Sequence, residues 1–308
     1  ALGERGNGAP ILPTVVAPAN AAELLGVTVT MTSTTRPVAA ATATPLPAVT
    51  STPEPTNTPE PTPEASPTNT PEPTATNTPI PIPASARLDG FVHQFQTWNN
   101  CGPATIAMAL SYYGLGLDQA ETAVFLKPDP EDRNVSPYQM VDYVNENTPY
   151  SAISRNNGTT ETIKRLIANG YPTIIELGIE PPGEYRWLGW YGHYLLVVAY
   201  DDESEHFWVY DSWFGTSEVP MKNATVEGRV LEYADIGEQW RQFNRNYIVL
   251  FKDEEAAQVA DIIGEDMGDA TMWENSLLQN QSELQQETED AFLWFNLGRN
   301  YNALGKYE

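Results

Sequence analysis

FVHQFQTWNNCGPATIAMALSYYG, residues 91 to 114, contains the only cysteine of the chain and places it directly before a helix signal. Pro103 suits the first helical turn, because the amide that proline lacks has no intrahelical partner there. Apolar residues then recur at helical spacing up to Gly114, which suits a left-handed cap. The stretch therefore predicts a helix with Cys101 at its N-terminus. Unpaired amides and the helix dipole favour a negative charge at that end, which suits a reactive thiol.

The composition is strongly acidic. The 308 residues carry a net charge of −25, and the isoelectric point is near 4.3. Nucleic acids and anionic lipids require a basic patch, so both are excluded as expected partners. A single cysteine excludes a disulfide within the chain.

No apolar run approaches the roughly 20 residues that span a bilayer, and no signal peptide is visible. The chain begins at Ala1 rather than at a methionine. We therefore treat it as a processed or truncated piece, from which an export signal or anchor could have been lost.

Proline and threonine crowd into the first quarter of the chain. Residues 1–36 are mostly small and polar and predict disorder. In residues 44–83 the sequence TNTPEPT occurs at 56–62 and again at 68–74. Such a tract predicts a solvated, polyproline-like spacer with a reach on the order of 100 Å. Spacers of this kind hold domains away from surfaces, which favours an extracellular or cell-surface location. An ordinary interdomain linker is the alternative.

Helical patterns precede strand patterns in the part expected to fold, from about Leu88 onward. After the Cys101 helix, further helices are predicted at residues 118–126, 136–145 and 160–170, and from about 236, with Asp118, Ser136 and Thr160 as caps. Strands are predicted at residues 150–154, 171–179, 193–200, 206–213 and 246–251. The run 193–200 is apolar on both faces, so it belongs in the middle of a sheet. This order predicts an α+β domain with an antiparallel sheet.

The acidic turn DDESE between two of these strands permits a geometric argument. If the turn centres near Glu203, antiparallel pairing opposes residues whose numbers sum to about 404 to 406, so His193 faces residues 211–213. A register with an even sum puts His193 and Asp211 on one face, close enough to interact directly or diagonally. The hairpin thus predicts an imidazole base and a carboxylate that orients it.

These groups are the parts of an activated nucleophile. His193 would accept the proton of the Cys101 thiol and later give one to the leaving group, while Asp211 fixes the tautomer of the ring. The carbonyl under attack also needs a donor for its developing oxyanion. Gln96, five residues before Cys101, is the nearest suitable glutamine, and the backbone N–H of Cys101 would be the second donor.

The same residues resemble a known family. QTWNNCGPA, followed far downstream by GHYLLVVAYDD and VYDSW, is similar to papain-like cysteine peptidases of the bacteriocin-processing, double-glycine type, and more closely to their stand-alone bacterial relatives. The resemblance covers about residues 88–252 and implies a papain-like fold. It also implies that Gln96, Cys101, His193 and Asp211 form the site.

Two departures from the family pattern matter. The family's glutamine often lies six residues before the cysteine, where this chain has Phe95, so Gln94 remains a rival for Gln96. No membrane or ATPase segment accompanies the domain. Cleavage after a Gly-Gly leader is therefore not carried over.

Each candidate residue also has a simpler interpretation. A lone cysteine is often only a small buried side chain, and His193 and Asp211 could be a core histidine and a turn carboxylate. His206 lies at the far end of the hairpin, and His93 lies in an apolar context where a hydrogen bond to the backbone is expected. Three aromatic residues could line a substrate cleft or simply pack: Trp187, Trp190 and Tyr191. One cysteine and three scattered histidines give no metal-ligand spacing, and no glycine loop suits a phosphate, so we expect neither metal nor cofactor.

The C-terminal residues carry a second resemblance. AFLWFNLGRNYNALGKYE, residues 291–308, resembles the first helix and turn of a tetratricopeptide repeat. The matching residues are Trp294, Leu297, Gly298, Tyr301, Gly305 and Tyr307. Such units are stable only when about three or more stack, so we expect the native protein to continue beyond Glu308. A repeat array would bind a peptide or a partner protein, whereas the alternative is a single amphipathic helix.

The sequence thus predicts a disordered segment and spacer at 1–86, a papain-like cysteine peptidase domain at 87–253 and a helical segment with a partial repeat at 254–308. We expect an exported thiol hydrolase that acts on peptides or proteins, with membrane contact only through a missing N-terminal anchor. Other thiol acyl transfers, such as amide hydrolysis or transpeptidation, stay open. The alternative from another class is a non-catalytic scaffold, in which a degenerate peptidase domain holds peptides for the repeats.

Overall fold

The computed structural model describes residues 81–129, 131–180, 189–214 and 227–306. The predicted spacer up to residue 80 and Trp187 lie outside these ranges. Within them, every helix is too short or too polar to cross a lipid bilayer.

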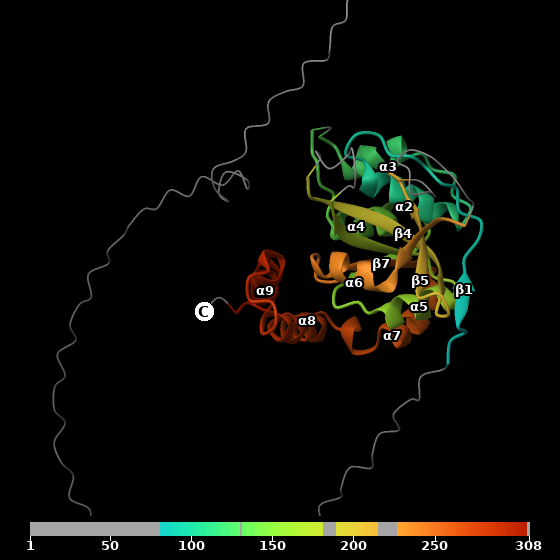
Figure 1. Cartoon of the computed structure of the whole chain (residues 1–308). Coiled ribbons are helices and arrows are strands. Elements are labelled where there is room, and N and C mark those ends of the chain that lie inside the picture. Colours follow the sequence, from blue (N-terminus) through green and yellow to red (C-terminus); the bar gives the residue numbers. More distant parts are fainter. Residues whose placement is uncertain (1–80, 130, 181–188, 215–226, 307–308) are drawn as a thin grey trace, which may run out of the picture. The chain divides into compact units, whose positions relative to one another are not determined.

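One antiparallel sheet runs through the middle of the domain (Figure 1). Its strands follow the order β2-β7-β3-β4-β5-β6, and β1 pairs with the C-terminal part of β4. The bounds are β1 Ser85–Arg87, β2 Ser151–Arg155, β3 Thr173–Ile179, β4 Tyr191–Asp201, β5 His206–Asp211, β6 Arg229–Glu232 and β7 Tyr247–Phe251. The central place predicted for the apolar strand is confirmed, because β4 lies between β3 and β5.

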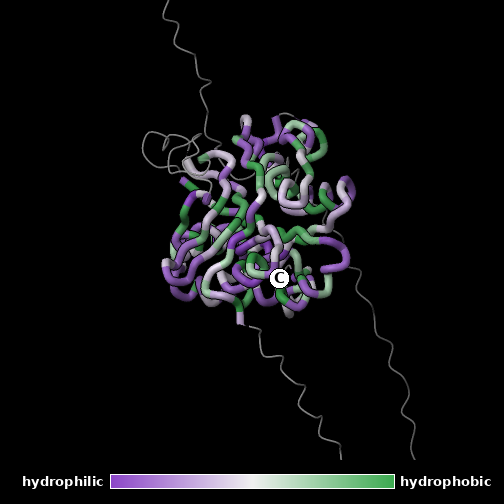
Figure 2. Tube along the Cα trace, turned by 90° about the vertical axis from the view of Figure 1, so that its right-hand side faces the viewer, coloured by the Kyte–Doolittle hydropathy of each residue, from purple (hydrophilic) through white to green (hydrophobic). Residues whose placement is uncertain are grey.

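Helices cover both faces of this sheet (Figure 1). Their bounds are α2 Cys101–Ser111, α3 Gln119–Leu126, α4 Pro137–Asn147, α5 Thr160–Ala168, α6 Tyr233–Arg241, α7 Ala256–Ile263, α8 Asp269–Leu284 and α9 Ala291–Ala303, with 3-10 turns η2 Asp253–Glu255 and η3 Gly264–Met267. Helices α2, α3 and α4 build one core with Ile106, Leu126 and Met140, whereas α5, α6 and α7 build the other with Leu166, Trp240 and Val259. Hydrophobic positions concentrate along the inner strands and helices, and the outer turns are mainly hydrophilic (Figure 2).

The helix that carries the cysteine forms as predicted. It begins at Cys101, and the chain leaves it through Gly114, whose φ of +83° is the left-handed conformation that glycine adopts cheaply. Asp118 caps α3 through its side chain, which accepts a hydrogen bond from the Ala120 amide. Ser136 precedes α4, as expected.

Other boundaries differ from the prediction. The cap of α5 is Thr159 rather than Thr160, because the Thr159 hydroxyl accepts the amide hydrogen of Thr162. Helix α6 begins at Tyr233, three residues before the predicted start. Strands β1 and β6 are absent from the prediction, since each has only three or four residues, and β1 pairs with a strand more than 100 residues away in the sequence.

The β4–β5 hairpin contains a shift that the sequence argument did not include. Paired residue numbers sum to 407 near the turn, at Tyr200 and Phe207, and to 406 near the open end, at Leu195 and Asp211. The change comes from an irregularity in the ladder between Val197 and Ala199. Because side chains alternate between faces, an unbroken odd register would have turned the Asp211 side chain away from that of His193.

The C-terminal helices pack against the rest of the domain. Val259 of α7 is buried in the core shared with α5 and α6. Helix α9 contacts the end of α6, where the Asn296 side chain donates to the Arg241 carbonyl at 2.7 Å and the Asn244 side chain donates to Asn300 Oδ1 at 2.7 Å. The predicted domain boundaries and the assignment of residues 291–308, which include α9, to the start of a tetratricopeptide repeat stay predictions.

Candidate active site

His193 and Asp211 form a fully buried pair. His193 lies near the start of β4 and Asp211 ends β5, and the imidazole Nε2 is 2.8 Å from the carboxylate Oδ1. The carboxylate pairs with Nε2, so Nε2 carries the hydrogen and donates it. This leaves Nδ1 as the nitrogen available to a reacting group.

Several other donors converge on the same carboxylate. The backbone amides of Trp213 and Phe214 donate to Asp211 Oδ1 at 2.8 and 3.0 Å, and the Arg229 guanidinium donates to Oδ2 at 3.2 Å. Burial alone would raise the pKa of Asp211, but the charges of His193 and Arg229 and these hydrogen bonds hold it well below its usual range. Asp211 therefore stays ionised and fixes the orientation of the imidazole.

The Cys101 thiol lies beside this imidazole. Burial would lower the pKa of His193, but the charge and hydrogen bond of Asp211, together with hydrogen bonding and charge from Cys101, raise it to about 10. Nδ1 is buried and has no fully formed hydrogen bond to any described residue. An incompletely formed contact between thiol and imidazole is typical of a catalytic site without substrate, where the nucleophile and base approach closely only in the bound complex. The predicted cysteine, histidine and aspartate thus meet in one place.

The two glutamines before Cys101 have different surroundings. The side-chain amide of Gln94 is occupied on both sides, because its Nε2 donates to the Leu117 carbonyl at 2.6 Å and its Oε1 accepts from the Gln119 amide at 2.9 Å. Gln96 accepts a hydrogen bond at Oε1 from the Ser212 hydroxyl, at 2.8 Å. That bond orients the side chain and leaves its NH₂ group as the donor for another acceptor.

Residues 88–247, more than half of the chain, match the model of the Peptidase_C39 like family. The chain belongs to this C39-like peptidase family. The predicted family of the domain is therefore confirmed. A search of curated proteins gives no match.

Three solved structures are similar to the C39-like domain. A structure described as a C39-like peptidase from Bacillus anthracis is 14% identical, with a TM-score of 0.40, over 55% of this chain and 98% of that one. The peptidase domain of Streptococcus ComA, a bifunctional ABC transporter of a quorum-sensing pathway, is 16% identical, with a TM-score of 0.37, over 54% and 100%. Xylellain, a cysteine protease from Xylella fastidiosa, is 14% identical, with a TM-score of 0.39, over 56% and 87%.

The other two histidines of the C39-like domain lie away from the reacting nitrogen. His93 donates from Nε2 to the Asp211 carbonyl at 2.8 Å, the kind of backbone hydrogen bond that was expected for it. Burial lowers the pKa of His93, which therefore stays neutral at neutral pH. His206 opens β5, at the opposite end of that strand from Asp211.

Aromatic side chains flank the start of β4. The Tyr191 ring lies edge-on to the His193 ring, with centroids 6.0 Å apart. Burial and the charges of Asp211 and Cys101 raise the pKa of Tyr191, so its hydroxyl keeps its proton beside the site. Trp190 stacks instead on Phe243, with centroids 5.8 Å apart, and 42% of its surface is exposed. Of Trp190 and Tyr191, the two members of this group that the structure describes, Tyr191 is thus the one that adjoins the candidate triad.

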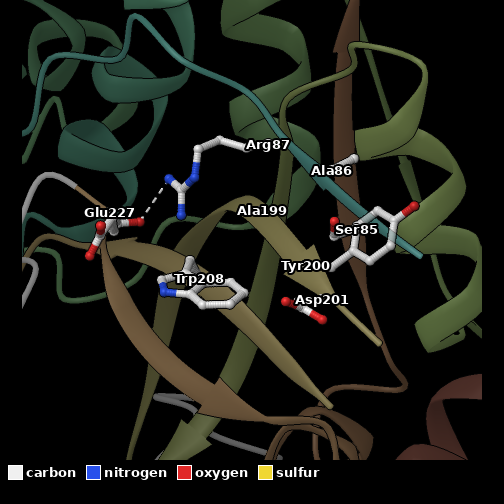
Figure 3. A pocket seen from close by; sticks show the side chains of 8 residues that line it. All are labelled: Ser85, Ala86, Arg87, Ala199, Tyr200, Asp201, Trp208 and Glu227. Atoms are coloured by element: carbon white, nitrogen blue, oxygen red, sulfur yellow. Dashed lines mark hydrogen bonds between the residues drawn. The ribbon is translucent and has the colours of Figure 1, made fainter. Parts of the chain in front are cut away.

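Several surface hollows lie in the described part of the domain, and two of them are lined by residues near β4 or near Cys101 in the sequence. One, of about 540 Å³, is walled by Arg87, whose guanidinium reaches over the Trp208 ring to the Glu227 carbonyl (Figure 3). It adjoins the Asp201 end of β4, eight residues from His193, which is roughly 26 Å along a strand. The other, of about 360 Å³, is lined by Trp98 and Asn100, directly before Cys101. The second hollow is therefore lined by the residue that precedes the candidate nucleophile in the sequence, Asn100.

Sequence reasoning missed three residues that support the site: Ser212, Arg229 and Gln119. Arg229 lies opposite Val209 on β6, so the period of two along a strand places it on the face of Asp211. Recognition of β6 would have revealed that pairing. The described residues contain no cluster of three or more His, Cys, Asp or Glu that could hold a metal ion.

Proposed function

We propose that the domain is a thiol hydrolase that cleaves peptide bonds, with Cys101 as nucleophile, His193 as acid and base, Asp211 as its orienter and Gln96 as oxyanion donor. The observation that carries this proposal is the buried imidazole, bonded at Nε2 to an ionised carboxylate and influenced by the Cys101 thiol. Membership of a peptidase family supports the same conclusion.

The first half of the reaction would form a thioester. Because the pKa of His193 is raised to about 10, the ring rests as an imidazolium, and the reactive form of Cys101 is the thiolate. The sulfur attacks the carbonyl carbon, and the electron pair of the C=O bond moves to oxygen. Gln96 Nε2 and the Cys101 backbone N–H donate to this oxyanion, the term that often contributes most to catalysis. As the C–N bond breaks, His193 gives its Nδ1 proton to the leaving amine.

The second half would release the acyl group. The now neutral His193 accepts a proton from water at Nδ1, and the hydroxyl oxygen adds to the thioester carbon. Collapse of this intermediate breaks the C–S bond and frees the carboxylic acid. The sulfur leaves as thiolate beside the imidazolium, so the resting pair is restored. Asp211 keeps its charge throughout and holds the ring in one tautomer.

A peptide-library digest tests the proposal directly. The chain is incubated with the library beside a Cys101→Ala variant, and mass spectrometry identifies new termini. We expect cleavage by the wild type only, and the cleaved peptides give the specificity. Two results together would contradict the proposal. The wild type would cleave no peptide, and iodoacetamide would label Cys101 at the same rate in wild type and His193→Ala.

Partner binding through the C-terminal helices is a second candidate function. Three large apolar side chains of α8 and α9 are more than half exposed, namely Leu278, Trp294 and Phe295. This pattern suits the repeat resemblance, and it also suits the non-catalytic scaffold. A scaffold predicts an inert thiol and no cleavage, with binding of library peptides that Trp294→Ala reduces. An equilibrium pull-down of the library with wild type and Trp294→Ala separates these outcomes.

We also propose an extracellular or cell-surface location, which rests on the Pro/Thr-rich sequence of residues 44–83 alone. Protease treatment of intact expressing cells tests it. An exposed spacer would release the domain into the medium, whereas an internal protein would stay intact until lysis.

A further inference from the structure

The segment that carries Gln96 is held by one buried side chain of the neighbouring helix. Gln119 occupies the first position of α3 and is only 7% exposed. Its Nε2 donates to the Phe95 carbonyl at 2.6 Å, and its Oε1 accepts from the Thr97 amide at 2.8 Å. A single amide group therefore fixes the backbone on both sides of Gln96.

The same side chain also reaches the residue before the nucleophile. Gln119 Oε1 accepts a hydrogen bond from Asn100 Nδ2 at 2.8 Å, and Asn100 is buried directly ahead of Cys101. Between these contacts the chain passes through Asn99, whose φ of +51° costs free energy for a residue with a side chain. Lys127, at the other end of α3, donates to the Asn99 carbonyl at 2.9 Å and holds that turn in place.

The opposite side of the segment is held by the end of β5. The backbone N–H of Gln96 donates to the Ser212 carbonyl at 2.8 Å, and the Ser212 hydroxyl donates to the side-chain Oε1 of Gln96 at 2.8 Å. Ser212 directly follows Asp211. The segment thus lies between the helix that begins with Gln119 and the strand that ends with Asp211, so a shift on the Gln119 side would move Gln96 relative to the triad.

We propose that Gln119 is a positioning residue for catalysis, which holds the Gln96 side chain and the Cys101 N–H at the place where the oxyanion forms. This inference rests on the proposed function, because it requires a tetrahedral intermediate. Gln119 does not touch the reacting atoms. It acts through Phe95, Thr97 and Asn100, and an error of about 1 Å in such placement can cost about 100-fold in rate.

The test compares two reactions of Cys101. Hydrolysis of the best-cleaved library peptide requires the oxyanion donors, whereas alkylation by iodoacetamide forms no oxyanion and requires only the thiolate. For Gln119→Met we expect kcat to fall by about 10- to 100-fold, the loss that a displacement of about 1 Å in the placement of catalytic groups can cause. KM and the rate constant for alkylation should stay close to the wild-type values.

Thr122→Val is the matched control. Thr122 lies in the same helix, is fully buried and donates from its hydroxyl to the Pro103 carbonyl of α2 at 2.9 Å. Its replacement removes this buried hydrogen bond between α3 and α2, and a second one of 3.1 Å to the Gln119 carbonyl within α3, without touching residues 94–100 or the Gln119 side chain. We expect kcat to be unchanged once rates are scaled to the folded fraction, measured by circular dichroism.

The outcomes separate this inference from the proposed function. An equal loss of kcat in both variants, or a parallel loss of alkylation in Gln119→Met, would overturn the positioning role. If Gln119→Met does not fold, Gln119→Glu replaces it, since a carboxylate still accepts from Thr97 and Asn100 but cannot donate to Phe95. A normal kcat in that variant would also overturn the role. Failure of the proposed function appears earlier, as a wild type without cleavage.

Discussion

Asp211 and His193 lie diagonally across the β4–β5 ladder. Asp211 is paired with Leu195, and His193, two residues before Leu195 on β4, places its imidazole 2.8 Å from the Asp211 carboxylate. Arg229 approaches from the other neighbouring strand in the same manner, since it is paired with Val209 and donates to the second carboxylate oxygen. The position of the imidazole is therefore set by the registers of two strand pairs. Diagonal partners of this kind interact when their side chains are long enough.

Asp211→Asn should lower kcat by about 10²- to 10⁴-fold through loss of the preferred tautomer. It should also lower the pKa of His193, because the charge that raises this pKa is removed. Initial rates of peptide cleavage and NMR titration of the ring protons measure the two effects. Asp201→Asn, at the far end of β4, is the control. Unchanged cleavage by Asp211→Asn would contradict the orienting role.

The stability of the domain should depend on pH through His193. The folded state raises the pKa of His193 from 6.5 to about 10. The resulting stabilisation is complete below pH 6.5 and is lost as the pH rises towards 10. In this window the free energy of unfolding should fall more steeply for wild type than for His193→Gln, by at most about 1.4 kcal/mol per pH unit. Urea unfolding measures the slopes.

His206→Gln provides the control for this measurement. His206 lies at the opposite end of β5 from Asp211 and outside the buried pair. Its substitution should leave the wild-type slope intact. Equal slopes for wild type and His193→Gln would show that the buried pair does not hold a proton into the alkaline range.

The two glutamines should differ in their kinetic effects. Gln96→Ala should lower kcat by about 10²- to 10³-fold, since it removes an oxyanion donor, and should leave alkylation of Cys101 unchanged. Gln94→Ala should chiefly lower stability, because the Gln94 amide is bonded to Leu117 and Gln119. Steady-state kinetics and urea unfolding of both variants check this. The reverse pattern would make Gln94 the oxyanion donor.

Gly192→Ala should impair both folding and cleavage. A Cβ at this position would lie 2.7 Å from Phe243 Cζ, so the ring or the start of β4 must move, at a cost of about 1–3 kcal/mol. His193 follows directly, so kcat should fall as well. Gly237→Ala in α6 has open space around it and should stabilise the domain by up to about 1 kcal/mol. Thermal unfolding ranks the two variants, and equal stability would refute the close approach at Gly192.

The helices and the central hairpin were predictable because their information is local. Pro103, Asp118 and Ser136 mark helix starts through chemistry that acts within one turn. The apolar composition of the strand that contains His193 indicated that this strand is buried on both faces. Antiparallel pairing with a sum of about 404 to 406 then followed from the short acidic turn, whereas the choice between an even and an odd sum stayed open.

The remaining features depend on contacts that no local pattern records. The register shift between Val197 and Ala199 sits inside a continuous apolar run, so nothing in the sequence marks it. Strand β6 has only four residues, and its two apolar residues are adjacent between Arg229 and Glu232, so no alternation indicates a strand or the ion pair of Arg229 with Asp211. The bonds from Gln119 to residues 95, 97 and 100 join a helix to an irregular segment, and periodicity carries no information about such contacts.

The carboxylate of Asp211 also closes the end of β5, because it accepts the amides of Trp213 and Phe214. Asp211 thus stabilises the end of β5 in addition to the role that we propose for it in catalysis. A descendant that lost its nucleophile would remain under selection to keep an aspartate here. Among relatives, this carboxylate alone would not distinguish working enzymes from inactive descendants, whereas the thiol would.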